Sequence, residues 1–282
     1  MRHSHPSSSI FYPLVCQEPN SWRRPRGASP DSNAAPATDW PTVASDPQLA
    51  MVRENGVVAA SNRKALELFA PIAGNYERWA TVLSLGQDPR WRRMMVADLQ
   101  LAPEARVLDV AAGTGAITRL LESNGARVVA CDQSIDMLRV AKLRGATVVL
   151  GTAGDLPFPE ESFDAVTFGY LLRYVDPGAV MRELVRVLRP GGRIGMVEFG
   201  RPRGIWGPLW WLYTRLVLPV AGAALSPGWR TVGSFLGPSI DAFDDQFPPS
   251  RLVDVWQAAG LAEVRVARRS VGGGLIMWAR KP

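Results

Sequence analysis

Residues 107–115 read Val-Leu-Asp-Val-Ala-Ala-Gly-Thr-Gly, and this stretch decides the fold. A short β-branched run, residues 106–110 (RVLDV), predicts a strand that leads into the glycines, and the helical spacing of Ile117, Leu120 and Leu121 follows them. The pattern therefore predicts a strand, a glycine turn and a helix. Glycine at such a turn lets a ligand approach the backbone, but the third glycine that admits a pyrophosphate in dinucleotide-binding folds is missing.

Strand and helix patterns alternate on both sides of this turn. Further strands are expected at residues 128–131, 147–150, 165–168, 193–198, 262–267 and 274–279, and helices at 135–144, 177–188 and 251–259. Asp176 is the expected N-cap of the second helix, and Pro190-Gly191-Gly192 is the expected stop after it. Alternating strands and helices imply a parallel sheet. We predict an α/β, Rossmann-like fold with a seven-stranded, mostly parallel sheet, an antiparallel C-terminal hairpin strand and, from residues 62–101, an N-terminal helical cap.

Composition bounds the domain organisation. Residues 1–50 are rich in Ser, Pro, Ala and Asn and predict a disordered tail, which leaves residues 51–282 as one folded domain. The two cysteines, Cys16 and Cys131, are too few for a disulfide framework, and no His/Cys cluster has metal-ligand spacing. We expect a cytoplasmic protein without a metal site. The arginines that carry most of the net charge of +6 are dispersed, so no nucleic-acid partner is expected.

One segment departs from the alternation. Residues 205–225 are almost entirely apolar and contain three tryptophans, but two prolines and Arg215 make a membrane span unfavourable. We predict an insertion at residues 205–245 that forms an apolar lid over a hydrophobic substrate site. Shallow contact of residues 205–225 with the inner face of a membrane is a second hypothesis, and ordinary core packing is the alternative to both.

A carboxylate stands at the end of the second strand. Asp132 follows the apolar residues 128–131 and lies 17 positions after Gly115. A carboxylate in this place can accept hydrogen bonds from both hydroxyls of a ribose. The alternative role is a helix N-cap, which Ser134 fits at least as well. The next loop, residues 151–158 (GTAGDLPF), follows the third strand.

With that loop the chain resembles class I S-adenosylmethionine-dependent methyltransferases, and among them the menaquinone/ubiquinone biosynthesis C-methyltransferase family. The similarity runs from about residue 69 to 281. Besides the glycine turn, it is carried by residues 69–77 (FAPIAGNYE), 83–86 (LSLG) with Trp91-Arg92, 172–175 (LRYV), 186–192 (RVLRPGG), Glu198-Phe199 and 234–240 (SFLGPSI). The resemblance implies S-adenosylmethionine as cosubstrate and methyl transfer to a hydrophobic small molecule, foremost C-methylation of a demethylmenaquinol-like quinol.

The resemblance also implies a set of cofactor-binding residues. Together with the glycine and ribose motifs they are Asp109, Ala111, Gly113, Thr114, Gly115, Asp132, Gln133, Thr152, Ala153 and Gly169. Three positions depart from the family pattern. Thr152 stands where Asp or Asn usually precedes the alanine, Gly169 stands where serine is usual, and Tyr174 replaces the asparagine of Leu-Arg-Asn-Val.

Two residues are candidates for the chemistry. Arg173 is expected to stabilise the forming phenolate of a quinol, and its alternative role is an ion pair with Asp176 or Glu183. Tyr76 is expected to close over the cofactor or to donate a hydrogen bond to the substrate, a role that Tyr170 also fits. No histidine follows His5, so a histidine base in the folded domain is excluded.

Other functions remain open at this point. The three departures make a methyltransferase of another hydrophobic or phenolic metabolite a serious alternative. A noncatalytic binding or scaffold module of the same fold is the alternative from another class, although the intact Gly113, Gly115 and Asp132 argue against it. A nicotinamide-dependent oxidoreductase is disfavoured by the missing third glycine.

Overall fold

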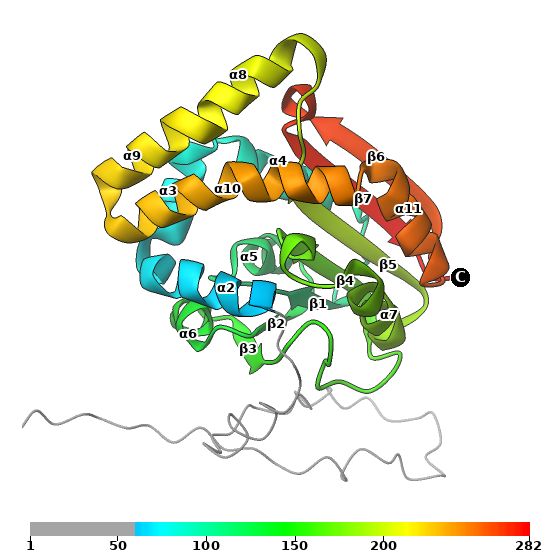
Figure 1. The fold of residues 1–282 in the computed structure, drawn as a ribbon. Helices are drawn as coiled ribbons and strands as arrows, with labels where there is room; N and C mark the ends of the chain where they lie inside the picture. The colour runs from blue at the N-terminus through cyan, green and yellow to red at the C-terminus, as the bar shows by residue number, and fades with distance from the viewer. Residues whose placement is uncertain (1–59) are drawn as a thin grey trace, which may run out of the picture. The chain divides into compact units, whose positions relative to one another are not determined.

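A seven-stranded sheet forms the centre of the computed structural model, which describes residues 60–282, with side chains from residue 65 onward. The expected tail at residues 1–50 lies outside the described residues. The strand order is β3-β2-β1-β4-β5-β7-β6 (Figure 1). The strands are β1 Arg106–Val110, β2 Arg127–Asp132, β3 Thr147–Leu150, β4 Phe163–Gly169, β5 Leu188–Phe199, β6 Ala262–Arg269 and β7 Gly274–Arg280. In this sheet β7 alone runs opposite to the other six strands, which confirms the predicted fold class.

Helices cover both faces of the sheet. They include α4 Gln87–Asp98, α5 Ala116–Ser123, α6 Ile135–Leu143, α7 Pro177–Val187 and α11 Pro249–Ala258. On one face α4 presents Trp91 and Met95 to β5 and β7, and Trp278 of β7 donates its indole N–H to the Met95 carbonyl at 3.0 Å. On the opposite face Phe168 of β4 meets Trp256 of α11. Because side chains alternate along a strand, each face of the sheet packs its own buried layer against its helices.

The end of α7 differs from the expectation. Asp176 caps this helix as predicted, since its carboxylate accepts a hydrogen bond from the Ala179 N–H at 2.6 Å. The helix ends at Val187, however, and residues 190–192 lie inside β5. The proline and glycines therefore do not stop the helix. They accompany a register shift between β4 and β5, where the pairing passes from Phe163 with Leu188 to Ala165 with Arg193.

Two helical segments lie at the C-terminal edge of the parallel strands. Of the cap predicted at residues 62–101, α4 packs on the face of the sheet instead. The cap proper consists of α2 Ala60–Phe69, the 3₁₀ helix η2 Ala70–Asn75 and α3 Tyr76–Leu83. The insertion between β5 and α11 consists of η4 Gly204–Trp206, α8 Gly207–Leu212, η5 Tyr213–Val217, α9 Leu218–Leu225 and α10 Pro227–Gln246. The helices α8 to α9 and α10 form a hairpin, drawn yellow and orange in Figure 1.

The hairpin and the cap share a small apolar core. Leu68 and Ile72 of the cap pack with Trp229 and Val232 of α10. The Trp229 indole N–H also donates to the Asn75 side-chain oxygen at 2.9 Å. These contacts fix the cap against α10, so that both segments border the same edge of the sheet.

Candidate functional site

The glycine turn after β1 is the floor of the site. Gly113 and Gly115 have φ values of +58° and +82°, which side-chain-bearing residues rarely adopt. A Cβ on Gly113 would meet nothing within 4 Å, so the backbone is open on that side, whereas a Cβ on Gly115 would lie 3.4 Å from the Cβ of Ala141 in α6. Gly113 therefore offers its backbone to a ligand, and Gly115 lets the turn pass close to α6.

Asp132, the last residue of β2, is held against this turn. One carboxylate oxygen accepts the Gly113 N–H at 2.8 Å, and the other accepts the Ser134 N–H at 2.7 Å. The N-cap of α6 is Ser134, whose hydroxyl accepts the Met137 N–H, so Asp132 is not the capping residue. Burial raises the pKa of Asp132, and the backbone hydrogen bonds partly offset that rise.

A cavity lies above the turn, between the strand ends and the cap. Its lining comes from the helices α2 to α6, from the ends of β1, β2 and β4, and from the loops after β3 and β4. The lining residues are Ala65, Leu66, Phe69, Tyr76, Arg92, Ala111, Ala112, Gly113, Thr114, Ile117, Asp132, Gln133, Ser134, Met137, Gly151, Ala153, Gly154, Gly169, Tyr170, Leu171, Tyr174 and Val175. One carboxylate, one guanidinium and several tyrosines thus converge on a mainly apolar space, as expected for a small-molecule site.

The structure brings most of the expected cofactor residues to this cavity. Ala111, Gly113, Thr114, Asp132, Gln133, Ala153 and Gly169 line it. Asp109, Gly115 and Thr152 do not. Thr152 instead forms a backbone bridge with Asp155, and its neighbour Gly151 reaches the lining.

Asp109 lies beneath the turn and stabilises it from inside. Its carboxylate is fully buried and accepts hydrogen bonds from the hydroxyls of Thr118, at 2.7 Å, and Thr167, at 3.0 Å. Burial raises the pKa of Asp109 from 3.8 to about 6, although both hydroxyls favour the charged form. The side chain therefore supports the cofactor turn and does not contact the cavity.

Two of the departures from the family pattern have a visible cause. A Cβ on Gly169 would lie 3.1 Å from side-chain atoms of both Ile117 and Val197, so a larger residue would require these neighbours to move. Tyr174 lines the cavity, with its ring 6.0 Å from that of Phe69 in an edge-on arrangement and 6.1 Å from Phe235 in a stacked one. The aromatic ring thus fills a position between the cap and α10 that an asparagine would leave open.

Tyr76, the first residue of α3, lines the cavity. Its ring stacks on Trp229 at a centroid distance of 6.2 Å and meets Phe69 edge-on at 5.7 Å. Within the described residues its hydroxyl has no hydrogen-bond partner. Burial raises the pKa of Tyr76 to about 12, so this hydroxyl is a donor at neutral pH.

Arg173 occupies a different environment from the one expected. It does not line the cavity, and its Nε donates to the Glu198 carboxylate at 3.0 Å while an Nη donates to Ser239 at 3.0 Å. The expected ion-pair partners were wrong, because Asp176 caps α7 and Glu183 pairs with Arg186. The side chains of Arg173 and Glu198 are both buried, so this pair joins the β4 loop to β5 in the interior.

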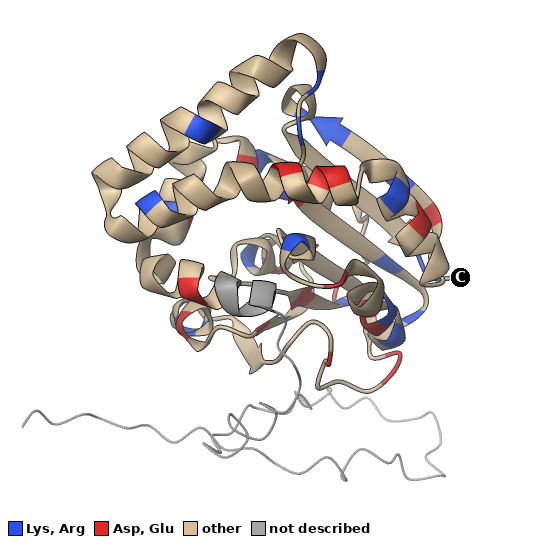
Figure 2. Cartoon of the chain, in the orientation of Figure 1, with Lys and Arg blue, Asp and Glu red and all other residues tan. Residues whose placement is uncertain are grey.

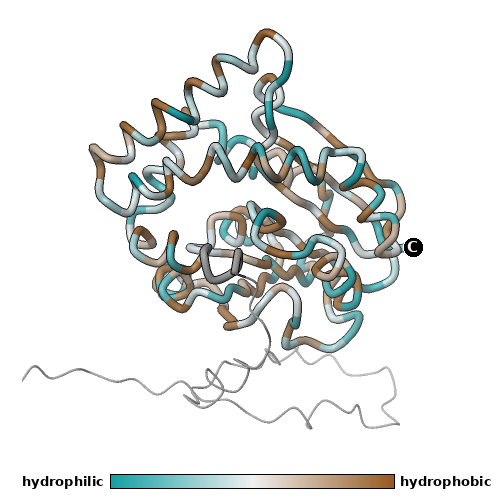
Figure 3. Tube along the Cα trace, in the orientation of Figure 1, coloured by the Kyte–Doolittle hydropathy of each residue, from teal (hydrophilic) through white to brown (hydrophobic). Residues whose placement is uncertain are grey.

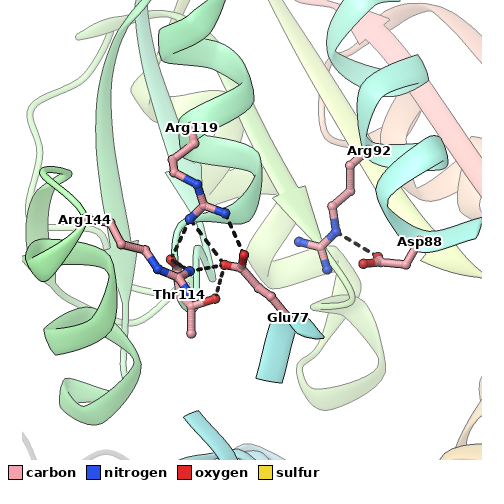
Figure 4. A network of polar contacts seen from close by, with 6 residues as sticks. All are labelled: Glu77, Asp88, Arg92, Thr114, Arg119 and Arg144. Carbon is pink, nitrogen blue, oxygen red and sulfur yellow. Dashed lines mark hydrogen bonds and ion pairs between the residues drawn. The ribbon is translucent and has the colours of Figure 1, made fainter. Parts of the chain in front are cut away.

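A second ionic network holds the cap to the glycine turn (Figure 4). Glu77 of α3 accepts hydrogen bonds from the Thr114 hydroxyl, from Arg119 of α5 and from Arg144 after α6. Burial alone would raise the pKa of Glu77, but the hydrogen bonds from Arg119 and Thr114 lower it. A single charged carboxylate therefore links three elements around the site.

Some lining residues were not foreseen as functional. Arg92 of α4 and the apolar groups Leu66, Phe69 and Met137 reach the cavity. The sequence named Phe69 and Arg92 only as parts of the family resemblance and gave none of the four a role at the site. Arg92 is 7% exposed and pairs with Asp88 one turn earlier, at 2.7 Å. A charged pair at i and i+4 on an otherwise buried helix face is the signal that would have indicated it.

The strand order, the open glycine turn and the carboxylate at the end of β2 define a class I S-adenosylmethionine-dependent methyltransferase. The model of the ubiE/COQ5 methyltransferase family matches residues 57–281, and the chain belongs to this family. S-adenosylmethionine is accordingly its cosubstrate. The resemblance stated from the sequence is confirmed.

Curated relatives match about three quarters of this chain over nearly their own full length. A demethylmenaquinone methyltransferase of Mycolicibacterium gilvum is 40% identical over 225 residues, which cover 76% of this chain and 96% of that protein. A protein of the same name from Streptomyces griseus is 37% identical over 219 residues, covering 74% and 90% of the two chains.

Solved structures agree on the fold. A methyltransferase of Thermotoga maritima matches with a TM-score of 0.54 at 20% identity, covering 77% of this chain and 99% of that chain. Phosphoethanolamine N-methyltransferase 2 of Haemonchus contortus, solved with S-adenosylmethionine, matches with a TM-score of 0.51 at 15% identity, covering 68% and 52%.

Proposed function

We propose that this enzyme transfers a methyl group from S-adenosylmethionine to a ring carbon of a demethylmenaquinol-like quinol. The observation that carries the proposal is the identity of 40% to a demethylmenaquinone methyltransferase over 96% of that protein's length. The cavity supports it, because aromatic and aliphatic side chains of the cap and of the β4 loop surround the polar turn.

The residues of the site fit the cosubstrate. The Asp132 carboxylate offers acceptors for a ribose, and the open Gly113 backbone leaves room beside it. Apolar groups such as Ile117 and Met137 suit an adenine or a thioether. S-adenosylmethionine supplies a methyl group that its sulfonium already activates, so the protein's task is to align the acceptor and to exclude water.

Tyr76 is the residue that we assign to the acceptor. Its hydroxyl has no hydrogen-bond partner within the described residues and adjoins the cavity, so it donates a hydrogen bond to an oxygen of the quinol. Arg173 remains a prediction as the cation that stabilises the phenolate. Arg173 does not line the cavity, and Tyr174 lies between them: the guanidinium carbon is 5.3 Å from the centre of the Tyr174 ring. Its charge would act on the phenolate across that ring.

A methyltransferase of another phenolic metabolite is the second candidate. Gly169 and Tyr174, which line the cavity, and Thr152, which adjoins it, are the observations that favour this alternative, because they depart from the family pattern. The test is to incubate the purified full-length protein with labelled S-adenosylmethionine and either reduced demethylmenaquinone or simple phenols. Label in the quinone ring supports the proposal, and label confined to the phenols contradicts it. Asp132→Ala is the inactive control.

We further propose that the insertion at residues 205–245 places the site at an anionic membrane surface. Its outer apolar ridge, defined as the exposed side chains of Ile205, Trp206, Leu209, Trp211, Leu212, Leu216, Val217 and Val220, is open to solvent. Hydrophobic residues follow α8 and α9 along their length (Figure 3). The ridge segment, residues 205–225, contains Arg215 and no carboxylate, and no red appears on α8 or α9 in Figure 2, while Arg215 pairs with Asp241 of α10 at 2.6 Å.

Beside this ridge, the apolar lid over a substrate site stays a prediction. No residue of 205–245 lines the cavity, but Trp229 stacks on Tyr76 and Phe235 stacks on Tyr174, two residues that do line it. Core packing does not account for the ridge, because its side chains are exposed. Within residues 60–282 no helix is long and apolar enough to cross a bilayer, so the proposed contact is interfacial.

Vesicle sedimentation tests the membrane proposal. The full-length protein should bind vesicles of phosphatidylglycerol and phosphatidylcholine, and Leu209→Asp with Trp211→Asp should abolish binding. Leu143→Asp, at an 88% exposed leucine on α6, is the matched control. Equal binding by the ridge variant and the control variant would contradict the proposal.

A further inference from the structure

Arg92 is a buried cation at the inner wall of the cavity. It lies on α4, is 7% exposed, and its Nε donates to an oxygen of Asp88 at 2.7 Å. The same oxygen accepts the Tyr170 hydroxyl at 2.5 Å, and the guanidinium carbon lies 5.1 Å from the centre of the Tyr170 ring. Tyr170 in turn stacks on Phe199 at 4.5 Å. The orientation of the guanidinium is therefore fixed from two sides.

The terminal nitrogens of Arg92 are not used by these contacts. Within the described residues its hydrogen bonds go through Nε alone, to Asp88. In Figure 4 the two terminal nitrogens carry no dashed line and lie on the side that faces Thr114, which also lines the cavity. Within the described residues these two nitrogens have no acceptor and border the cavity, and the planar fork that they form matches a carboxylate.

The sheet order shows which part of a ligand would reach Arg92. Asp132, the ribose acceptor, ends β2, and Gly151 and Ala153 follow β3 on its outer side. Arg92 lies on the β4 side of the site. Its guanidinium carbon is 5.1 Å from the centre of the Tyr170 ring, directly after β4, and its charge is near enough to Asp109 of β1 to lower the pKa of that carboxyl. In the order β3-β2-β1-β4, a ligand with its base near β3 and its ribose over β2 extends its remaining arm toward Arg92.

We propose that Arg92 binds the carboxylate of the methionine arm of S-adenosylmethionine through its two terminal nitrogens. Asp88 acts as a positioning residue, because it orients the fork and does not line the cavity, whereas Tyr170 both lines the cavity and packs against the guanidinium. This inference rests on S-adenosylmethionine being the cosubstrate and is independent of the identity of the acceptor. The inference gives Arg92 of α4 a binding function of its own, which neither the glycine turn nor Asp132 can perform.

A pair of ligands that differ only in this carboxylate tests the assignment. Calorimetric titration of the full-length protein would compare S-adenosylmethionine with decarboxylated S-adenosylmethionine. The wild-type protein should prefer the carboxylated ligand by about 10- to 100-fold, the range for hydrogen bonds to a charged group. Arg92→Gln should lose most of this preference, and Arg92→Lys should keep part of it. Arg93→Gln, at the exposed neighbouring arginine, should keep the wild-type preference.

The ratio of the two dissociation constants decides the matter. Because both ligands are measured on one variant, a general loss of affinity does not change the ratio. A wild-type ratio near one overturns the assignment without any variant, and so does a ratio that Arg92→Gln leaves unchanged. If the wild-type protein binds neither ligand, the cosubstrate itself is wrong, which is a different result from an unchanged ratio.

Discussion

The hydroxyl of Thr114 in the glycine turn donates a hydrogen bond of 2.5 Å to the carboxylate of Glu77, which lies 37 residues earlier in the cap. Arg119 and Arg144 bind the same carboxylate, so Glu77 connects the cap to the glycine turn that forms the floor of the cavity (Figure 4).

Replacing Glu77 by glutamine should loosen the cap. The variant loses the charge that two arginines share, and since these groups are partly exposed we expect only about 1 kcal/mol of lost stability. The affinity for S-adenosylhomocysteine should fall as well, because the cap lines the site. Denaturant unfolding and calorimetry measure the two effects. Glu67→Gln, on the exposed side of α2, is the control, and an equal effect there would contradict the prediction.

Asp132→Ala should abolish most cofactor binding. It removes the proposed ribose acceptor and also the acceptor of the Gly113 N–H. Losing hydrogen bonds to a charged group costs about 1.5–3 kcal/mol each, so the dissociation constant of S-adenosylhomocysteine should rise by more than about 10-fold. Asp136→Ala, at an exposed aspartate four residues later, should leave the affinity unchanged. Retained affinity in Asp132→Ala would show that the ribose lies elsewhere.

Asp109 should make stability depend on pH. Its pKa of about 6 in the folded protein exceeds the 3.8 of an ordinary aspartate, so between these values the folded state holds a proton that the unfolded state has released. The free energy of unfolding should therefore fall as pH rises through this window, by about 3 kcal/mol. Asp109→Asn lacks this contribution. Urea unfolding of both proteins from pH 4 to 7 tests it, and a constant difference between them would refute the prediction.

Tyr76→Phe should separate stability from activity. The hydroxyl has no partner within the described residues, and the stacking on Trp229 is kept, so the melting temperature should stay unchanged. Methyl transfer should slow by about 10-fold, the value of one hydrogen bond to the acceptor. Thermal unfolding and a methyl-transfer assay are the measurements. Full activity would exclude the hydroxyl from the reaction.

Gly233→Ala should disrupt the helical hairpin. A Cβ at this position would lie 2.5 Å from the Leu218 carbonyl oxygen, so α9 and α10 would have to separate. We expect about 1–3 kcal/mol of lost stability, despite the better helix propensity of alanine. Gly207→Ala in α8 is the control, because its Cβ would meet only Pro202 O at 3.7 Å and should be neutral or stabilising. Similar unfolding free energies for both variants would contradict the close packing of α9 against α10.

The sequence by itself determined the sheet and its cofactor turn. Periodicity placed β1 and β3 with their observed bounds, and the glycines with Asp132 indicated the ribose site, because these are local signals carried by neighbouring residues. Asp176 was assigned as a cap for the same reason. The family resemblance extended this to the cosubstrate.

Only the tertiary structure decided which side chains meet. The sequence does not show that Asp109 lies under the turn, that Arg173 pairs with Glu198, or that Arg92 opens its fork into the cavity. Each of these relationships joins segments far apart in the chain, and their distances depend on how α4, the cap and the strand ends pack. A residue type and its spacing predict an element, whereas a buried charge finds its partner through the packing of all elements together.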